Sequence, residues 1–145
     1  MRILGVRAAP KETSFVVFCT EERTFKCVDV VNIPQTLNIP EKLKYIRNSI
    51  LDILREYSVD TAAIRVAESN TKNLNIERLY IEGVIQETFA SSNVAQYYTL
   101  RKNGICSRLG ITIAQFNDDE IRGIQLSDYD ANTKEAILSA LAVEN

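Results

Sequence analysis

The sequence predicts an α/β fold with a mixed five-stranded sheet, in which three antiparallel strands precede parallel crossovers and helices flank the sheet. Three observations carry this prediction. The first third of the chain holds three segments rich in β-forming residues, separated by short polar connections. Apolar residues then recur three and four apart, which is the period of a helix. A further strand segment follows each of the first two helices, as parallel crossovers require.

The first three strands are expected over Arg2–Ala8, Ser14–Thr20 and Phe25–Asn32. The second segment is dense in β-branched and aromatic residues, and the third alternates in part between apolar and polar residues. The connections Ala9–Glu12 and Glu21–Arg23 are short and polar. Connections of this kind are typical of antiparallel hairpins.

Two helices are expected in the middle of the chain. Apolar residues over Pro40–Tyr57 form one helical stripe, and Pro40 suits the first turn because its missing N–H costs nothing there. The second helix is expected over Ile76–Phe89, with Asn75 as its N-terminal cap. A glycine inside a helix lowers its stability, so Gly83 predicts a close contact between this helix and the sheet.

The remaining elements complete the order β-β-β-α-β-α-β-α. Thr61–Ala67 and Val94–Leu100 are the expected fourth and fifth strands, and the last helix is expected to start near Thr133. Asn132 or Thr133 is its expected cap. The stretch Arg101–Ala131 gives no clear element.

The composition fits one domain over residues 1–145, with 46% hydrophobic residues and no Gly-, Ser- or Pro-rich linker. A net charge of −2 argues against a protein that binds nucleic acid by neutralising many phosphates, although it does not exclude a local basic patch. The absence of histidine excludes Ser-His-Asp and Cys-His catalysis and His-ligated zinc. Three cysteines without a CxxC spacing and no long apolar run predict a cytoplasmic protein with no cofactor and no membrane partner.

Four short features carry a resemblance to a known family: Ile3–Arg7, Asp60–Arg65, Gly83 placed 18 residues after Arg65, and Glu135–Ala142. They resemble the RuvC-like branch of the ribonuclease-H-like superfamily, including its short bacterial members. In that family an Ile-Leu-Gly-Ile run precedes a catalytic Asp, an Ala-Ile pair precedes a catalytic Glu, and the last helix carries two Asp three residues apart. The resemblance implies the ribonuclease-H-like fold, whose central first strand lies beside the fourth.

The chain departs from this family at the positions that would catalyse. The resemblance implies phosphodiester cleavage by two Mg²⁺ ions held by four carboxylates, but the corresponding residues are Arg7, Arg65, Glu135 and Leu138. Arginine stays cationic and has no lone pair for a metal, so two guanidinium groups would repel Mg²⁺. We therefore expect a non-catalytic ribonuclease-H-like binding protein.

Two interpretations of Arg7, Arg65 and Glu135 stay open. They form either a closed ion-pair cluster or an anion site in which two forked donors clamp a phosphate or a partner's carboxylate. The enzymatic alternative is a divergent divalent-metal-dependent nuclease of the RuvC-like type, with Glu68, Asp128, Asp130 and Glu135 as a displaced metal site. Against this alternative, acidic residues just before a helix often stabilise the positive end of the helix dipole instead of binding a metal.

The expected partner is a protein, such as the toxin or nuclease that an immunity or inhibitor protein restrains. Asp118, Asp119 and Glu120 supply an acidic face suited to a basic partner. The segment Tyr97–Asn103, with Arg108, interleaves aromatic and basic residues and makes nucleic acid a weaker candidate. The sequence leaves the oligomeric state open.

Overall fold

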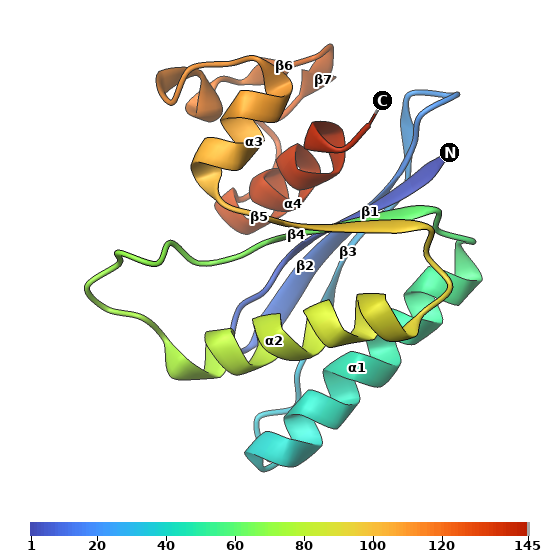
Figure 1. Ribbon diagram of the computed structural model, residues 1–145, viewed down its shortest axis with the longest axis vertical. Coiled ribbons are helices and arrows are strands. Elements are labelled where there is room, and N and C mark those ends of the chain that lie inside the picture. The colour runs from blue at the N-terminus through green and yellow to red at the C-terminus, as the bar shows by residue number, and fades with distance from the viewer. Residues whose placement is uncertain (145) are drawn as a thin grey trace.

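The computed structural model describes residues 1–144, in which a mixed sheet carries helices on both of its faces (Figure 1). The five strands lie in the order β3-β2-β1-β4-β5. Helices α1 and α2 cover one face, and α3 and α4 cover the other. The elements are β1 (Arg2–Arg7), β2 (Glu12–Cys19), β3 (Thr24–Asn32), α1 (Ile39–Glu56), β4 (Thr61–Arg65), α2 (Ile76–Ser91), β5 (Gln96–Leu100), α3 (Lys102–Leu109), β6 (Glu120–Ile121), β7 (Ile124–Gln125) and α4 (Ala131–Ala142).

The pairing of the strands confirms the predicted fold class. Strands β1, β2 and β3 are antiparallel neighbours, whereas β1, β4 and β5 pair in parallel. The first strand is therefore central and lies beside the fourth, as the resemblance implied. Every residue of β4 is buried, because helices cover both faces of the sheet at this point.

Local capping signals fix where the first two helices begin. Asn38 and Glu41 form a reciprocal capping box at the start of α1, with Pro40 in its first turn as predicted. The predicted cap of α2 is confirmed, since the Asn75 side chain accepts a hydrogen bond from the backbone N–H of Arg78. Both caps are formed between residues three apart in the chain, so such signals can be recognised in the sequence alone.

The predicted contact at Gly83 is wrong, and the close approach occurs at Gly5 instead. Gly83 is exposed, and no heavy atom lies within 4 Å of the position a Cβ would take. A Cβ on Gly5 would lie 2.1 Å from the backbone oxygen of Ala136 and 3.0 Å from the Cβ of Ala140. Helix α4 therefore packs directly on the backbone of β1.

The cap predicted for the last helix is also wrong. Helix α4 begins at Ala131, and its cap is Asp130, whose side chain accepts the backbone N–H of Thr133. Asn132 and Thr133 already lie within the first turn, where a side-chain cap is no longer needed.

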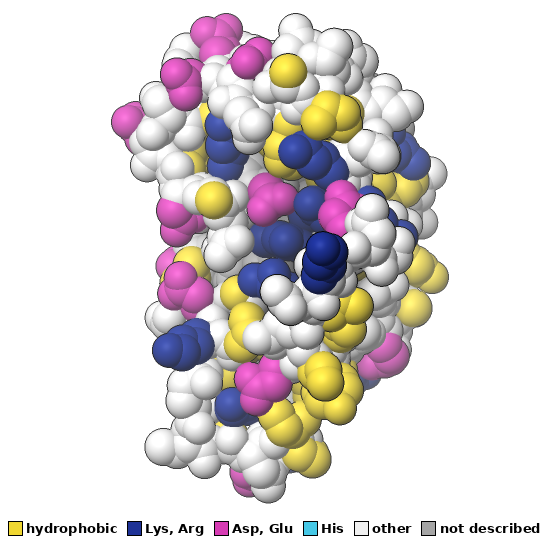
Figure 2. Space-filling view, turned by 90° about the vertical axis from the view of Figure 1, so that its left-hand side faces the viewer, with side chains coloured by type: hydrophobic (Ala, Val, Ile, Leu, Met, Phe, Trp, Pro, Cys, Tyr) yellow, Lys and Arg dark blue, Asp and Glu magenta, His cyan; other side chains and the backbone are white. Residues whose placement is uncertain are grey.

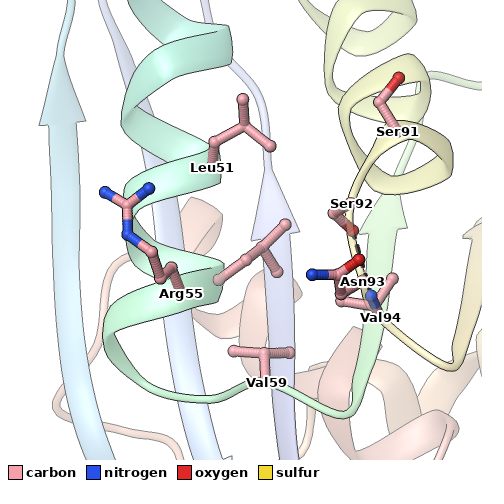
Figure 3. Close-up of a pocket in the computed structure, with 8 residues that line it drawn as sticks. Leu51, Arg55, Val59, Ser91, Ser92, Asn93 and Val94 are labelled. Atoms are coloured by element: carbon pink, nitrogen blue, oxygen red, sulfur yellow. Dashed lines mark hydrogen bonds between the residues drawn. The ribbon is translucent and has the colours of Figure 1, made fainter.

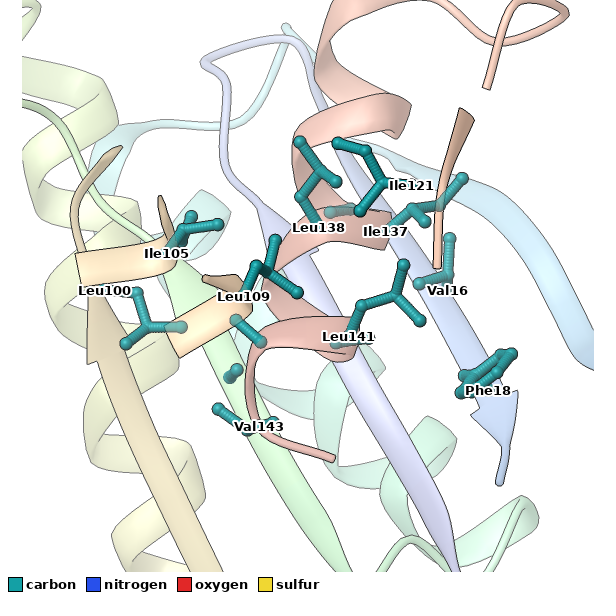
Figure 4. Packing of buried hydrophobic residues seen from close by; sticks show 14 of the residues in the cluster. Val16, Phe18, Leu100, Ile105, Leu109, Ile121, Ile137, Leu138, Leu141 and Val143 are labelled. Atoms are coloured by element: carbon teal, nitrogen blue, oxygen red, sulfur yellow. The ribbon is translucent and has the colours of Figure 1, made fainter. Parts of the chain in front are cut away.

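The stretch without a clear prediction folds into helix α3, a 3₁₀ turn over Ala114–Asn117 and the β6–β7 hairpin. These elements pack on α4 over one of two hydrophobic cores. Figure 4 shows Ile137, Leu138 and Leu141 of α4 meeting Val16 of β2 and Ile121 of the hairpin. Within residues 1–144, no helix is both long and apolar enough to span a membrane.

Candidate functional site

Arg7 and Arg65 lie side by side at the carboxyl ends of two central strands. They are direct partners in the parallel pairing of β1 with β4. Only 8% of Arg7 and 5% of Arg65 is exposed. Arg7 Nη1 also donates a hydrogen bond to the backbone oxygen of Arg65, 3.1 Å away. The structure thus brings together the two residues on which the site prediction depends.

Glu135 of α4 joins the two arginines. Its Oε1 accepts a hydrogen bond from Arg65 Nε at 3.1 Å, and its Oε2 lies 3.4 Å from Arg7 Nε. The second contact is an ion pair without hydrogen-bond geometry, and Arg7 Nε is buried with no hydrogen-bond partner within residues 1–144. One carboxylate therefore serves both guanidinium groups.

Two further carboxylates complete the set, which we call the arginine cluster: Arg7, Arg65, Glu68, Glu82 and Glu135. Glu82 Oε2 lies 3.9 Å from Arg7 Nη1, and Glu68 Oε1 lies 3.5 Å from Arg65 Nη2. Both carboxylates also accept backbone N–H groups, of Ala67 at 3.0 Å and of Lys102 at 3.2 Å respectively. Each acid is therefore fixed in place by the backbone as well as by charge.

Glu82 is the member that sequence reasoning missed. It lies three and seven residues before Ile85 and Phe89, both buried, so it occupies the stripe of α2 that faces the sheet. A carboxylate on such a stripe indicates a buried charge that needs a partner. This pattern is the signal by which Glu82 could have been found in the sequence.

Burial dominates the electrostatics of the arginine cluster. Desolvation lowers the pKa of the Arg7 guanidinium, and the neighbouring Arg65 acts in the same direction, while Glu135 and Glu82 oppose it. Desolvation also raises the pKa of the Glu82 carboxyl, against the N–H of Ala67 and the nearby arginines. Removing one member of such a buried set leaves an uncompensated charge, which costs about 3–5 kcal/mol.

The residues present do not fit the pair of divalent ions that the resemblance implies. Two guanidinium groups stand at the centre of the site and offer no lone pair to a metal. Over the described part of the chain, no three His, Cys, Asp or Glu side chains come close enough to hold a metal ion. Of the four acids of the alternative metal site, Glu68 and Glu135 contact Arg65, Asp130 caps α4, and Asp128 is exposed.

A cleft of about 210 Å³ opens beside the arginine cluster, between the first turns of α3 and α4. The ammonium of Lys102 lies 5.0 Å from the centroid of the Phe116 ring, and neither Lys102 nor Lys134 forms an ion pair within residues 1–144. Figure 2 shows basic side chains gathered at the centre of this end of the molecule, with acidic side chains beside them. The lining residues are Arg65, Lys102, Phe116, Asn117, Ala131, Lys134 and Glu135. The cleft is therefore suited to an anion.

The other predicted surfaces lie apart from the cleft. Asp118 and Asp119 follow the 3₁₀ turn and Glu120 begins β6, and all three are exposed. Arg108 stacks over the ring of Tyr98 at 4.6 Å, so its charge is used within the fold.

A further hollow of about 270 Å³ lies between the carboxyl-terminal ends of α1 and α2 (Figure 3). The one charged side chain in its lining, Arg55, pairs with Asp52 at 2.7 Å. This hollow therefore offers little chemistry to a ligand.

The comparisons with known proteins support the fold. No protein-family model matches the chain. The crossover junction endodeoxyribonuclease RuvC of Bordetella parapertussis is 32% identical over 73 residues, which cover 49% of this chain and 40% of that relative. The solved structure of Thermus thermophilus RuvC matches 98% of this chain and 92% of its own, with a TM-score of 0.72 and 12% identity. The fold is RuvC-like.

Two more solved structures share the RuvC-like fold. Thermus thermophilus RuvC in complex with a Holliday junction substrate has a TM-score of 0.74 at 14% identity, over 98% of this chain and 91% of that one. The yeast mitochondrial Holliday junction resolvase Ydc2 has a TM-score of 0.55 at 10% identity, over 97% and 81%.

These comparisons correct the predicted partner. The expectation of a protein partner was wrong, because the RuvC-like neighbours are junction resolvases and one of them is bound to DNA. The prediction gave weight to overall charge and to the acidic face. It underrated the basic side chains that the fold collects in one cleft.

Proposed function

We propose that this chain binds branched DNA through its RuvC-like fold and does not cut it by a two-metal mechanism. The observation that carries the proposal is the pairing of Arg7 with Arg65 on adjacent central strands. The resemblance places a catalytic Asp and Glu at these two positions. With arginine at both, the site gains positive charge, which suits a phosphate better than a metal ion.

The cleft beside the arginine cluster supports a nucleic-acid ligand. Lys102, Lys134 and the edge of Arg65 supply positive charge, and the cleft lies at the N-terminal ends of α3 and α4, where the helix dipoles favour an anion. Contacts of this kind position a DNA backbone without reading its sequence. The likeness to RuvC bound to a Holliday junction makes a four-way junction the first ligand to test.

The proposed binding is tested with a labelled four-way junction and a duplex of the same sequence, followed by fluorescence anisotropy in EDTA. We expect the junction to bind at least about tenfold more tightly than the duplex. The double variant Lys102→Glu/Lys134→Glu should weaken junction binding by about tenfold or more, because two phosphate contacts become repulsive. Lys44→Glu is the matched control, since Lys44 is exposed on α1, which covers the opposite face of the sheet.

Equal affinity for junction and duplex would contradict the branched-DNA proposal. Equal effects of the cleft double variant and Lys44→Glu would instead place the DNA elsewhere on the surface. Circular dichroism checks that each variant remains folded.

The second candidate is a divergent metal-dependent nuclease, which the likeness to RuvC favours. Carboxylates are still present around the two arginines. Incubation of the junction with 5–10 mM Mg²⁺ or Mn²⁺ (about the range used to saturate weak sites) separates the candidates. Junction cleavage that Glu135→Gln abolishes would establish the nuclease and refute the non-cutting proposal.

A further inference from the structure

A pocket of about 260 Å³ lies at the carboxyl ends of β4 and β5, on the side of the sheet that α2 covers. Its walls come from the segment after β4, from α2 and from the end of β5. The cleft proposed for DNA lies elsewhere, at the first turns of α3 and α4. Because the buried carboxylate of Glu82 lines this pocket, we call it the Glu82 pocket.

Gly83 leaves the Glu82 pocket open. It lines the pocket, and no heavy atom lies within 4 Å of the position that a Cβ would take. A glycine inside a helix lowers the stability of that helix, and here no close contact requires one. The open space is therefore a direct consequence of this residue.

Glu82 presents a hydrogen-bond acceptor from a buried position, since only 4% of the residue is exposed. Its Oε2 accepts the N–H of Ala67 at 3.0 Å and lies 3.9 Å from Arg7 Nη1. Its Oε1 accepts no hydrogen bond within residues 1–144. A carboxylate oxygen with so little access to water gains a strong hydrogen bond from a donor that enters the pocket.

The charge of Glu82 is already matched by guanidinium groups. Burial raises the pKa of the Glu82 carboxyl, while the positive charges of nearby arginines oppose this shift: Arg7, Arg78 and Arg65. An uncharged N–H donor therefore suits the pocket better than a free cation does.

Gln86 and Thr99 add hydrogen-bonding groups beside Glu82. Thr99 Oγ1 donates to Gln86 Oε1 at 3.1 Å, and Gln86 Nε2 donates to the backbone oxygen of Glu82 at 3.2 Å. These bonds leave one N–H of the Gln86 amide and the lone pairs of the Thr99 hydroxyl for a ligand. The pocket therefore offers both a donor and acceptors.

Apolar side chains and one arginine complete the lining. Val66, Leu74 and Leu79 contribute apolar surface, which suits the flat face of a ring. Arg101 Nε donates to the backbone oxygen of Ala67 at 3.2 Å, and Arg101 forms no ion pair within residues 1–144. Its terminal nitrogens are therefore left to bind a phosphate.

We propose that the Glu82 pocket binds a nucleotide whose base has an exocyclic amino group beside a ring-nitrogen acceptor, as cytosine and adenine have. The amino group donates to Glu82, the ring nitrogen accepts from Gln86, and the phosphate binds Arg101. The nucleotide is either free or an unpaired residue of a DNA strand. This inference goes beyond the proposed function, because the pocket is separate from the cleft proposed for DNA.

The test titrates isotope-labelled protein with dCMP and, in parallel, with dUMP, and follows the signals of Ala67, Gly83 and the Gln86 side-chain amide by NMR. We expect dCMP to shift these signals with a Kd of about 1 mM or tighter. The nucleotide dUMP should bind at least about tenfold more weakly, because it presents a carbonyl oxygen to the Glu82 carboxylate. The nucleotides dAMP and dIMP make the same comparison for a purine.

Single strands of oligo-dC and oligo-dU distinguish the two sources of the nucleotide. A preference for dCMP or dAMP over its oxo partner supports binding of a free nucleotide. A preference for oligo-dC over oligo-dU without any response to the mononucleotides assigns the pocket to an unpaired residue of a strand. If neither the mononucleotides nor the strands show a preference for the amino base, the inference is overturned.

Two glycine variants locate the binding. Gly83→Leu should abolish the nucleotide response, because the leucine side chain fills the open space. Gly104→Leu is the matched control: Gly104 also lies in a helix with no heavy atom within 4 Å of its Cβ position, so this variant should respond as the native chain does. An unchanged dCMP response of folded Gly83→Leu would contradict the inference.

The comparison of nucleotides on the native protein tests the inference even if Gly83→Leu fails to fold, which circular dichroism checks. None of these results depends on whether the protein binds a four-way junction.

Discussion

At the scale of single residues, Gly5 shows how closely α4 packs on the sheet. The missing side chain lets the backbone oxygen of Ala136 approach within 2.1 Å of where a Cβ would stand. The backbone oxygen cannot rotate away as a flexible side chain would. This contact positions the helix that carries Glu135, because Ala136 is the residue next to Glu135.

Gly5→Ala should destabilise the protein by about 1–3 kcal/mol or more, because an added methyl forces the backbone of α4 away from β1. Urea unfolding measures the change. Gly83→Ala is the matched control: its Cβ would meet no heavy atom within 4 Å, so it should be neutral or stabilise by about 0.5–1 kcal/mol. Equal losses for the two variants would show that Gly5 is not the contact that positions α4.

At the scale of secondary-structure elements, the cap of α4 explains an acid that the sequence also offered as a metal ligand. The Asp130 carboxylate accepts the backbone N–H of Thr133 at 2.8 Å, and this bond is the main reason why its pKa lies below the ordinary value. The charged form is therefore the one that stabilises the helix. Helix α4 in turn carries Glu135 to the two arginines.

Asp130→Ala should cost about 1 kcal/mol at pH 7. The folded pKa lies below the unfolded value of 3.8, so the contribution is present above the unfolded pKa and is lost as the pH falls through the folded pKa. The difference between native and variant should therefore shrink in urea unfolding near pH 3. Asp128→Ala is the control, since the exposed Asp128 makes no side-chain hydrogen bond within residues 1–144 and should change stability little at either pH.

At the scale of the whole molecule, a chain of net charge −2 places the cations of the proposed DNA site in one cleft. Phosphate contacts release counterions, so the salt dependence of binding counts them. The plot of log affinity against log salt should have a slope of about −2 to −3 for two or three phosphate contacts. Junction titrations between 50 and 200 mM KCl (about the range in which this law is applied) measure it.

The double variant Lys102→Glu/Lys134→Glu should flatten that slope by about 2, one for each lost contact. A slope that the double variant leaves unchanged would mean that neither lysine reaches a phosphate. A native slope near zero would show that phosphate contacts contribute little to junction binding.

The sequence by itself determined the order of the strands and first helices, because those signals are local. Asn75 caps α2 through its own neighbours, and the strand segments around Arg7 and Arg65 have their β-forming residues next to one another in the chain. The resemblance then placed the first strand beside the fourth. These features needed no knowledge of distant contacts.

Only the tertiary structure decided that Glu82 joins the two arginines and what the segment after β5 becomes. Glu82 lies 75 residues from Arg7 along the chain, and no local pattern shows that α2 brings it to the end of β1. The N-cap residue of α3 makes no side-chain cap; instead Glu68, from the segment after β4, accepts the N–H of Lys102, and α3 packs on α4. Neither contact is visible in the local sequence. Burial and charge pairing depend on which side chains the whole fold shields from water, and local sequence patterns do not specify those side chains.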